Sequence, residues 1–306
     1  MRRALAALLV LGLAGGIAGW LLTAPRPLNS ATIVAMPADN AVQGETIFWA
    51  GGCASCHAAP GADGDARLVL AGGLELGSPF GTFVAPNISP SKEHGIGAWN
   101  LAAFANAMLA GVGPDGGHLY PAFPYASYSN MTHQDVSDLF AFLKTLPVSE
   151  NVPGPNRLPF PFSIRRAVGG WKLLFFNGLA GNPRPDIDLS DPVVARGSYL
   201  VNGPGHCGEC HTPRNLIGGW KSDAWLSGAK NPEGEGRIPN ITPGGGIKDW
   251  SADDIASYLE TGFTPDFDSV GGSMVAVQKN MAHLTKEDRA AIAAYLKAIP
   301  ARPDGA

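Results

Sequence analysis

Two short stretches decide the fold: Cys53-Ala-Ser-Cys56-His57 and Cys207-Gly-Glu-Cys210-His211. Each has the spacing C-x-x-C-H, in which two thiols form thioethers to the vinyl groups of a haem and the histidine lies under the iron. All four cysteines of the chain fall in these motifs, so none remains for a disulfide or a catalytic thiolate. Zinc would need further cysteines or paired histidines at ligand spacing, which are absent. The motifs therefore predict two covalently bound haems c, with His57 and His211 as iron ligands.

The features that follow each motif occur twice. His57 and His211 are 154 residues apart, and three further pairs of segments keep nearly this spacing. They are 86–90 with 239–243 at 153 residues, 95–100 with 246–251 at 151, and 131–147 with 284–300 at 153. The repeat predicts two tandem copies of one haem domain, over residues 38–147 and 191–303.

Each copy has the signals of short helices joined by loops rich in glycine and proline. Thr132-x-x-Asp135, Ser251-x-x-Asp254 and Thr285-x-x-Asp288 are typical of helix N-termini, where side-chain oxygens accept from exposed N–H groups. Apolar spacing predicts helices near 101–109, 136–143, 255–259 and 290–296. No segment shows a convincing strand period. We therefore expect an all-α fold.

Composition narrows the class of partner. The 306 residues are 45% hydrophobic and 16% charged, with a net charge of −4 and no long run of like charges. The sequence therefore shows no sign of a basic surface that would bind phosphate groups, and nucleic acid is not an expected partner. Between the copies, residues 148–190 are rich in proline and aromatic residues. We expect this linker to pack against both domains and fix their separation.

The N-terminus carries a membrane signal. Arg2 and Arg3 precede nineteen uncharged residues, Ala4 to Leu22, which as a helix span about 28 Å of a bilayer core of about 30 Å. Trp20-Leu-Leu22 leads straight into a proline-rich segment instead of a small-x-small cleavage site, so residues 1–30 favour an uncleaved anchor over a signal peptide. Because positive charge stays cytoplasmic, we expect the haem domains on the periplasmic side of a bacterial inner membrane.

The sixth iron ligand decides what each haem does. A methionine thioether raises the reduction potential and completes an electron-transfer site. For the second haem we predict Met274, in a Gly271-Gly-Ser-Met274 loop before the last helix, with Met281 as the alternative. For the first haem we predict Met131, whose alternative is a packing role at the entry of a helix. Further candidates for the first haem, each with a structural alternative, are Met108, His118 and His133.

Five side chains are candidates to contact haem edges or propionates, with ordinary loop packing as the alternative. They are Trp99, Tyr120, Tyr125, Arg214 and Trp250.

Three segments, 118–125, 156–161 and 205–215, resemble the cytochrome c subunits of bacterial membrane-bound dehydrogenases, such as the quinoprotein alcohol dehydrogenase and gluconate dehydrogenase complexes. The resemblance extends from about Gly44 to Pro300. It implies a subunit without catalytic residues of its own, which passes electrons from a dehydrogenase catalytic subunit to ubiquinone or a terminal oxidase. Two departures stand out. Several such subunits carry three haem motifs, and many have Tyr-Pro-Ala-Met-Pro where this chain has Phe123.

Phe123 keeps a second hypothesis open. A dihaem enzyme, such as a peroxidase or an oxidase of a small sulfur compound, would use an open first haem as its active site. Against it, the sequence shows no clear acid/base constellation. A third hypothesis makes the protein a membrane tether whose haems are incidental.

Overall fold

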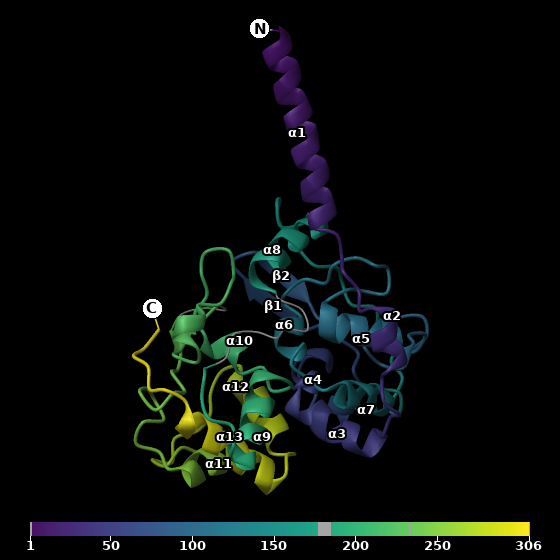
Figure 1. Cartoon of the computed structure of the whole chain (residues 1–306). Helices are drawn as coiled ribbons and strands as arrows, with labels where there is room; N and C mark the ends of the chain where they lie inside the picture. Colours follow the sequence, from purple (N-terminus) through teal and green to yellow (C-terminus); the bar gives the residue numbers. More distant parts are fainter. Residues whose placement is uncertain (1, 177–184, 233, 235, 306) are drawn as a thin grey trace.

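The computed structural model describes all residues except 1, 177–184, 233, 235 and 306. The chain is mainly helical, and α1 stands out from a body built of two groups of helices (Figure 1). The elements that lead into and form the first group are α1 (Arg2–Leu22), α2 (Ser30–Val34), α3 (Ala41–Ala50), α4 (Cys53–His57), β1 (Glu75–Ser78), β2 (Gly81–Val84), α5 (Leu101–Ala110), α6 (Tyr125–Tyr128) and α7 (His133–Leu143). After α8 (Val168–Phe175), the second group contains α9 (Pro192–Asn202), α10 (Gly208–His211), β3 (Ala229–Lys230), β4 (Arg237–Ile238), α11 (Ala252–Thr261), α12 (Met274–Met281) and α13 (Lys286–Ala298).

Both groups are built around a close crossing of their first and last long helices. Gly44 of α3 lies so near α7 that a Cβ there would stand 2.0 Å from the Asp138 carbonyl oxygen. Gly197 of α9 meets α13 in the same way, with a Cβ position 1.9 Å from the Ala291 oxygen. Only a residue without a side chain permits this approach of two backbones. The repeat seen in the sequence is thus matched by the same helix crossing in each group.

The predicted helices are present, each somewhat longer than the apolar spacing indicated. Thr132, Ser251 and Thr285 cap α7, α11 and α13 by accepting from the backbone N–H three residues on. At Ser251 the bond is reciprocal, because Asp254 also accepts from the Ser251 backbone. The capping signals therefore mark the true starts of these helices.

Two short hairpins were not predicted. β1 pairs antiparallel with β2, with Glu75 opposite Val84, and β3 pairs with β4, with Ala229 opposite Ile238. Strands of four and two residues are too short to show an alternating pattern. The fold is mainly helical with two small hairpins, so the expectation of no strands was wrong.

The described part of the linker contacts both groups. Arg157 exchanges backbone hydrogen bonds with Thr82 of β2, at N to O distances of 2.8 and 3.0 Å. On the other side, Phe175 of α8 covers Gly219, where a Cβ would lie 2.3 Å from its ring. Residues 177–184 of the predicted linker lie outside the described part of the chain.

The N-terminal helix is long and apolar enough to cross a membrane, with a mean hydropathy of 2.2 over Arg3–Leu22 and none of that span buried against the body. Its end is held by Arg166, whose guanidinium lies 4.3 Å from the centre of the Trp20 ring. The same side chain donates to the Trp20 carbonyl oxygen. A cation over an indole face adds about 0.5–1 kcal/mol at an exposed position.

Candidate haem sites

Each C-x-x-C-H motif forms a short helix entered through a left-handed residue. Gly52 precedes Cys53 with φ 61°, and His206 precedes Cys207 with φ 39°. This conformation turns the chain sharply out of α3 or α9 and into the motif. Glycine adopts it without a steric penalty, whereas a residue with a Cβ such as His206 pays about 1–2 kcal/mol. A residue with positive φ directly before the first cysteine is thus common to both motifs.

Both motif histidines are held by a proline carbonyl. His57 Nδ1 lies 2.8 Å from the Pro86 oxygen, and His211 Nδ1 lies 2.7 Å from the Pro239 oxygen. Because a carbonyl only accepts, Nδ1 carries the proton in each ring, which leaves Nε2 as the bare nitrogen with a lone pair for a metal ion. Burial lowers the pKa of both imidazoles, which keeps them in the neutral form that a metal needs.

The repeated Pro-Asn segments are in turn fastened by their asparagines. Asn87 is buried, and its amide donates to the carbonyl oxygens of Ser149 at 2.7 Å and Asn151 at 2.9 Å. Asn240 is also buried and donates to Arg302 O at 2.9 Å. These asparagines therefore belong to turn structure, and they position the prolines that orient the histidines.

The thiols of the two leading cysteines lie in apolar surroundings. Burial, followed by the nearby second thiol of the motif, raises the pKa of Cys53 and of Cys207 to about 12. A thiolate is thus disfavoured at both positions. A neutral thioether has no such desolvation cost, so these sites suit covalent attachment of an apolar macrocycle.

Two buried polar atoms support the fit of a haem. Tyr125 is fully buried, and neither its hydroxyl nor the indole N–H of Trp220 has a hydrogen-bond partner among the described residues. A buried donor without a partner costs about 1–3 kcal/mol. A haem brings two propionates, which accept hydrogen bonds. Tyr125 was among the predicted haem contacts, and its role there stays a prediction; Trp220 was not among them, because no motif marks it.

The candidate sixth ligands lie in different surroundings. Met274 is the first residue of α12 and is half-buried beside the core. Met131 is 5% exposed and lies within the core cluster just before α7. Its assignment as a ligand stays a prediction. His118 contacts Thr23 O through Nε2, and its Nδ1 has no partner in the part of the chain that the structure describes, so its ring faces the end of α1.

Three of the other predicted haem contacts already have protein partners. Tyr120 donates to Phe162 O at 3.2 Å, Arg214 pairs with Glu209, and the Trp250 ring packs 5.3 Å from Tyr258. For these three, the packing alternative is the one that the contacts favour.

The two motifs lie near each other in the fold. A Cβ at Gly52 would stand 3.7 Å from Cε1 of His206, so the residues that precede the two leading cysteines lie close together. Tyr128 lies beside them, donating to the Gly51 carbonyl at 3.1 Å with its ring centre 5.5 Å from that of His206. The sequence separation of the motifs gave no sign of this proximity, which brings together the residues just before the two C-x-x-C-H motifs.

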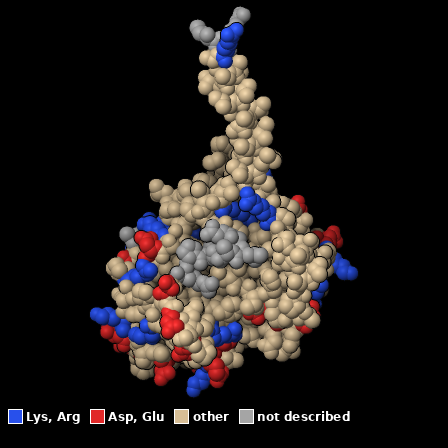
Figure 2. Space-filling model, in the orientation of Figure 1, with Lys and Arg blue, Asp and Glu red and all other residues tan. Residues whose placement is uncertain are grey.

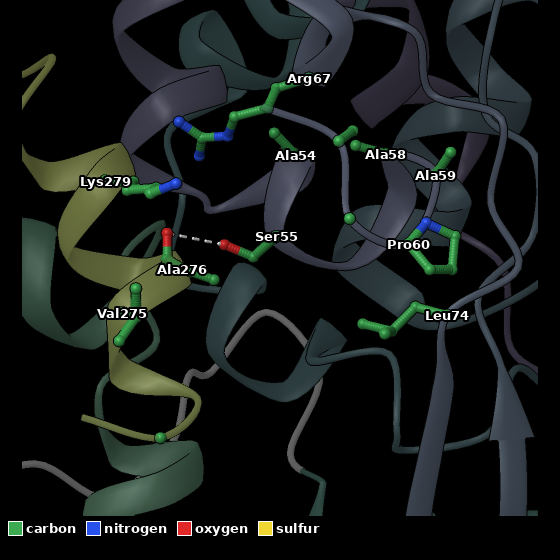
Figure 3. A pocket seen from close by; sticks show the side chains of 13 residues that line it. Ala54, Ser55, Ala58, Ala59, Pro60, Arg67, Leu74, Val275, Ala276 and Lys279 are labelled. Carbon is green, nitrogen blue, oxygen red and sulfur yellow. Dashed lines mark hydrogen bonds between the residues drawn. The ribbon is translucent and has the colours of Figure 1, made fainter. Parts of the chain in front are cut away.

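The helix that carries Met274 is pressed against the motif helix of the other group. Figure 3 shows Ser55 of α4 donating to the Ala276 carbonyl of α12, at 3.2 Å. Asn280 of α12 donates to Ser55 Oγ at 2.5 Å and accepts from Arg67. Ser55, Arg67 and Ala276 border a cavity of about 240 Å³ between the two helices. Each haem site is therefore supported by residues of the other group.

Covalent attachment motifs, proline-oriented histidines and a paired helical body together define a c-type cytochrome. A sequence profile of the family described as "Cytochrome c" matches residues 41–147. A protein of Cereibacter sphaeroides described as "Diheme cytochrome c-type" is 54% identical over 303 residues, which cover 98% of this chain and 99% of that protein. The chain belongs to the cytochrome c family.

Two further relatives are parts of dehydrogenases. The "Fructose dehydrogenase cytochrome subunit" of Gluconobacter japonicus is 40% identical over 265 residues, covering 86% of this chain and 53% of that protein. The "Alcohol dehydrogenase (quinone), cytochrome c subunit" of Gluconobacter oxydans is 35% identical over 302 residues, covering 94% of this chain and 61% of that protein. The chain thus spans little more than half the length of these subunits but nearly all of the Cereibacter relative.

Proposed function

We propose that this chain is the electron-transfer subunit of a membrane-bound dehydrogenase. Two tandem cytochrome c domains, 38–147 and 191–303, hold one haem c each through Cys53, Cys56 and His57 and through Cys207, Cys210 and His211. Met274 completes the second site. Electrons enter from a dehydrogenase catalytic subunit and leave to a quinone or a terminal oxidase, on the periplasmic side of a bacterial inner membrane.

The short distance between Gly52 and His206 is the observation that supports this proposal. These residues directly precede the two C-x-x-C-H motifs, and bound haems supply one-electron transfer without breaking bonds in a substrate. The protein's part is to hold both groups in a fixed, largely apolar setting. Tyr128 and the contacts of Ser55 with α12 serve this purpose, because they join the two groups of helices around the motifs.

Purification from the native membrane tests the assignment. A dehydrogenase catalytic subunit is expected to come down with the detergent-extracted protein, and its substrate should reduce the haem absorbance without added mediator. A quinone analogue should then reoxidise it. Peroxidase turnover by the isolated chain, with no reduction by any co-purified subunit, would instead support the enzyme hypothesis.

A cavity at the base of α1 favours a membrane quinone as the acceptor. It has a volume of about 550 Å³, within the range of small-molecule sites. The end of α1, the end of α5, His118 and α8 form its walls. Leu173 and Leu174 of α8 are exposed beside it, and Figure 2 shows basic side chains where the α1 stem meets the body. A hydrophobic ligand in the membrane has direct access to such a place.

His118 is one of the polar residues that line this cavity. Its side chain is 2% exposed, and Nε2 lies 2.9 Å from the Thr23 carbonyl oxygen, so Nε2 carries the proton. Nδ1 is then an acceptor, and it has no partner among the described residues. A quinol hydroxyl is a matching donor. Lys172 lines the same cavity, and burial lowers its pKa to about 7, which lets it exchange a proton near neutrality.

Replacing His118 with alanine is expected to slow quinone reduction about tenfold, the effect of losing one hydrogen bond of about 1.4 kcal/mol. Haem content and the rate of haem reduction by the dehydrogenase should stay unchanged. The matched control is His94→Ala, which alters a half-buried histidine of the same group outside the cavity. Equal quinone reduction by the two variants would contradict a quinone site at His118.

A further inference from the structure

The loops after α5 and α11 follow the same path. α5 ends at left-handed Gly111 and α11 at left-handed Gly262. An isolated bridge then joins Val112 to His118 in the first group and Phe263 to Ser269 in the second. The backbone bonds also correspond, since Leu119 N donates to Gly111 O at 2.8 Å and Val270 N to Gly262 O at 2.7 Å. Every pair is 151 residues apart, so the two loops are in register up to Leu119 and Val270.

Four residues further on, this register places Phe123 opposite Met274. The second group has two more residues before its last helix, and the longer α12 takes them up. Residues 120–127 of the first group contain no methionine, histidine, lysine or cysteine. Phe123 is half-buried, with its ring centre 5.5 Å from that of Tyr128. An aromatic ring that cannot bind iron thus stands where the second group has a thioether.

The two methionines of residues 101–147, Met108 and Met131, occupy places where the second group has leucine. Met131 precedes the cap of α7 and Leu284 precedes the cap of α13, and both are buried with equivalent backbone bonds to Tyr128 and Met281. Met108 on α5 and Leu259 on α11 are likewise both buried on their helices. A position that takes leucine in one copy is a packing position, so the register does not favour either methionine as a ligand.

The nearby lysine and histidine side chains, whose nitrogens could bind iron, already form hydrogen bonds with backbone carbonyl oxygens. Lys172 Nζ donates to the carbonyl oxygens of Ala110 at 2.7 Å and Gly111 at 2.6 Å. His118 holds Thr23 O, and His206 Nδ1 lies 2.8 Å from Pro204 O in its own turn. These hydrogen bonds hold Lys172, His118 and His206 on backbone carbonyl oxygens and not toward Phe123, so none of the three is a candidate iron ligand there.

We propose that the haem on Cys53 and Cys56 has an open sixth position, lined by Phe123, which binds a small uncharged diatomic molecule such as carbon monoxide or nitric oxide. The haem on Cys207 and Cys210 is closed by Met274. The apolar, aromatic lining of the first site suits a neutral ligand better than an anion, since an unpaired buried charge is costly. This inference rests on the proposed function, because it needs both haems to be attached.

Titration with carbon monoxide tests it on the full-length holoprotein. The number of haems per chain is measured first, on the denatured protein. A value below two would contradict the proposed function and not the open sixth position. With two haems present, the dithionite-reduced protein is expected to bind one carbon monoxide per chain. The oxidised protein should show one high-spin and one low-spin haem by electron paramagnetic resonance.

Three variants sharpen the result. Phe123→Met is expected to abolish carbon monoxide binding and give a second low-spin haem, whereas Phe123→Leu should still bind one. Met274→Phe should bind two carbon monoxide molecules per chain. A wild-type protein with two low-spin haems and no carbon monoxide binding overturns the proposal, and recovery of binding in Met131→Leu would then identify Met131 as the ligand. If Phe123→Met does not fold, the spin states of the two wild-type haems still show whether the first haem has an open sixth position.

Discussion

Replacing Cys207 and Cys210 together with alanine is expected to halve the covalent haem and to stop electron delivery to the quinone. The reason is chemical: without the two thioethers, only the single His211 to iron bond and packing remain to hold that haem. Electrons that arrive at the chain then have no acceptor at the second haem, whose methionine ligand raises its reduction potential. Haem staining after denaturing electrophoresis and the mass of the intact chain measure the loss.

The reciprocal variant provides the control. Replacing Cys53 and Cys56 leaves the second haem in place and should remove the carbon monoxide-binding signal, while the low-spin signal persists. Two covalent haems in either double variant would contradict the assignment of the motifs.

Gly44→Ala is expected to destabilise the first group severely, and Gly197→Ala the second. The new methyl group at position 44 would lie 2.0 Å from the Asp138 oxygen and 2.8 Å from Phe142 Cβ, so α3 and α7 must move apart. Overpacking of this kind costs about 1–3 kcal/mol and more when backbone is struck. At about 3 kcal/mol, the melting temperature falls by about 6–12 °C for a body of this size.

Thermal unfolding followed by circular dichroism measures this effect. The matched control is Gly170→Ala on α8, where nothing lies within 4 Å of a new Cβ. It should leave the melting temperature unchanged or raise it slightly, because alanine favours the helix. An unchanged melting temperature for Gly44→Ala would mean that the two helices do not cross this closely.

The sequence predicted what depends on neighbours along the chain. The C-x-x-C-H spacing is itself the chemistry of haem attachment, and the caps at Thr132, Ser251 and Thr285 act within one helical turn. The internal repeat also showed that His57 and His211 occupy equivalent positions in the two copies. The resemblance to dehydrogenase cytochromes also marked Phe123 as a departure from the family pattern.

What stayed out of reach depends on residues that lie far apart in the sequence. The role of Pro86 as the acceptor for His57, 29 residues away, follows from a folded loop and from no periodicity. The same holds for Trp220, whose indole N–H is identified only by its lack of a partner among the described residues. Two hairpins of a few residues each were missed because alternation needs more positions to be visible.

Local spacing and composition were enough to predict two haem attachment motifs in a duplicated helical unit behind an apolar N-terminal helix. The meeting of the two motifs at Gly52 and His206, the support of the opposite site by α12 through Ser55, and the place of His118 in a cavity beneath α1 follow from the folded chain alone. Packing between distant segments minimises exposed apolar surface and unpaired polar groups over the whole molecule, and because this is a property of the whole molecule, no local pattern records its outcome.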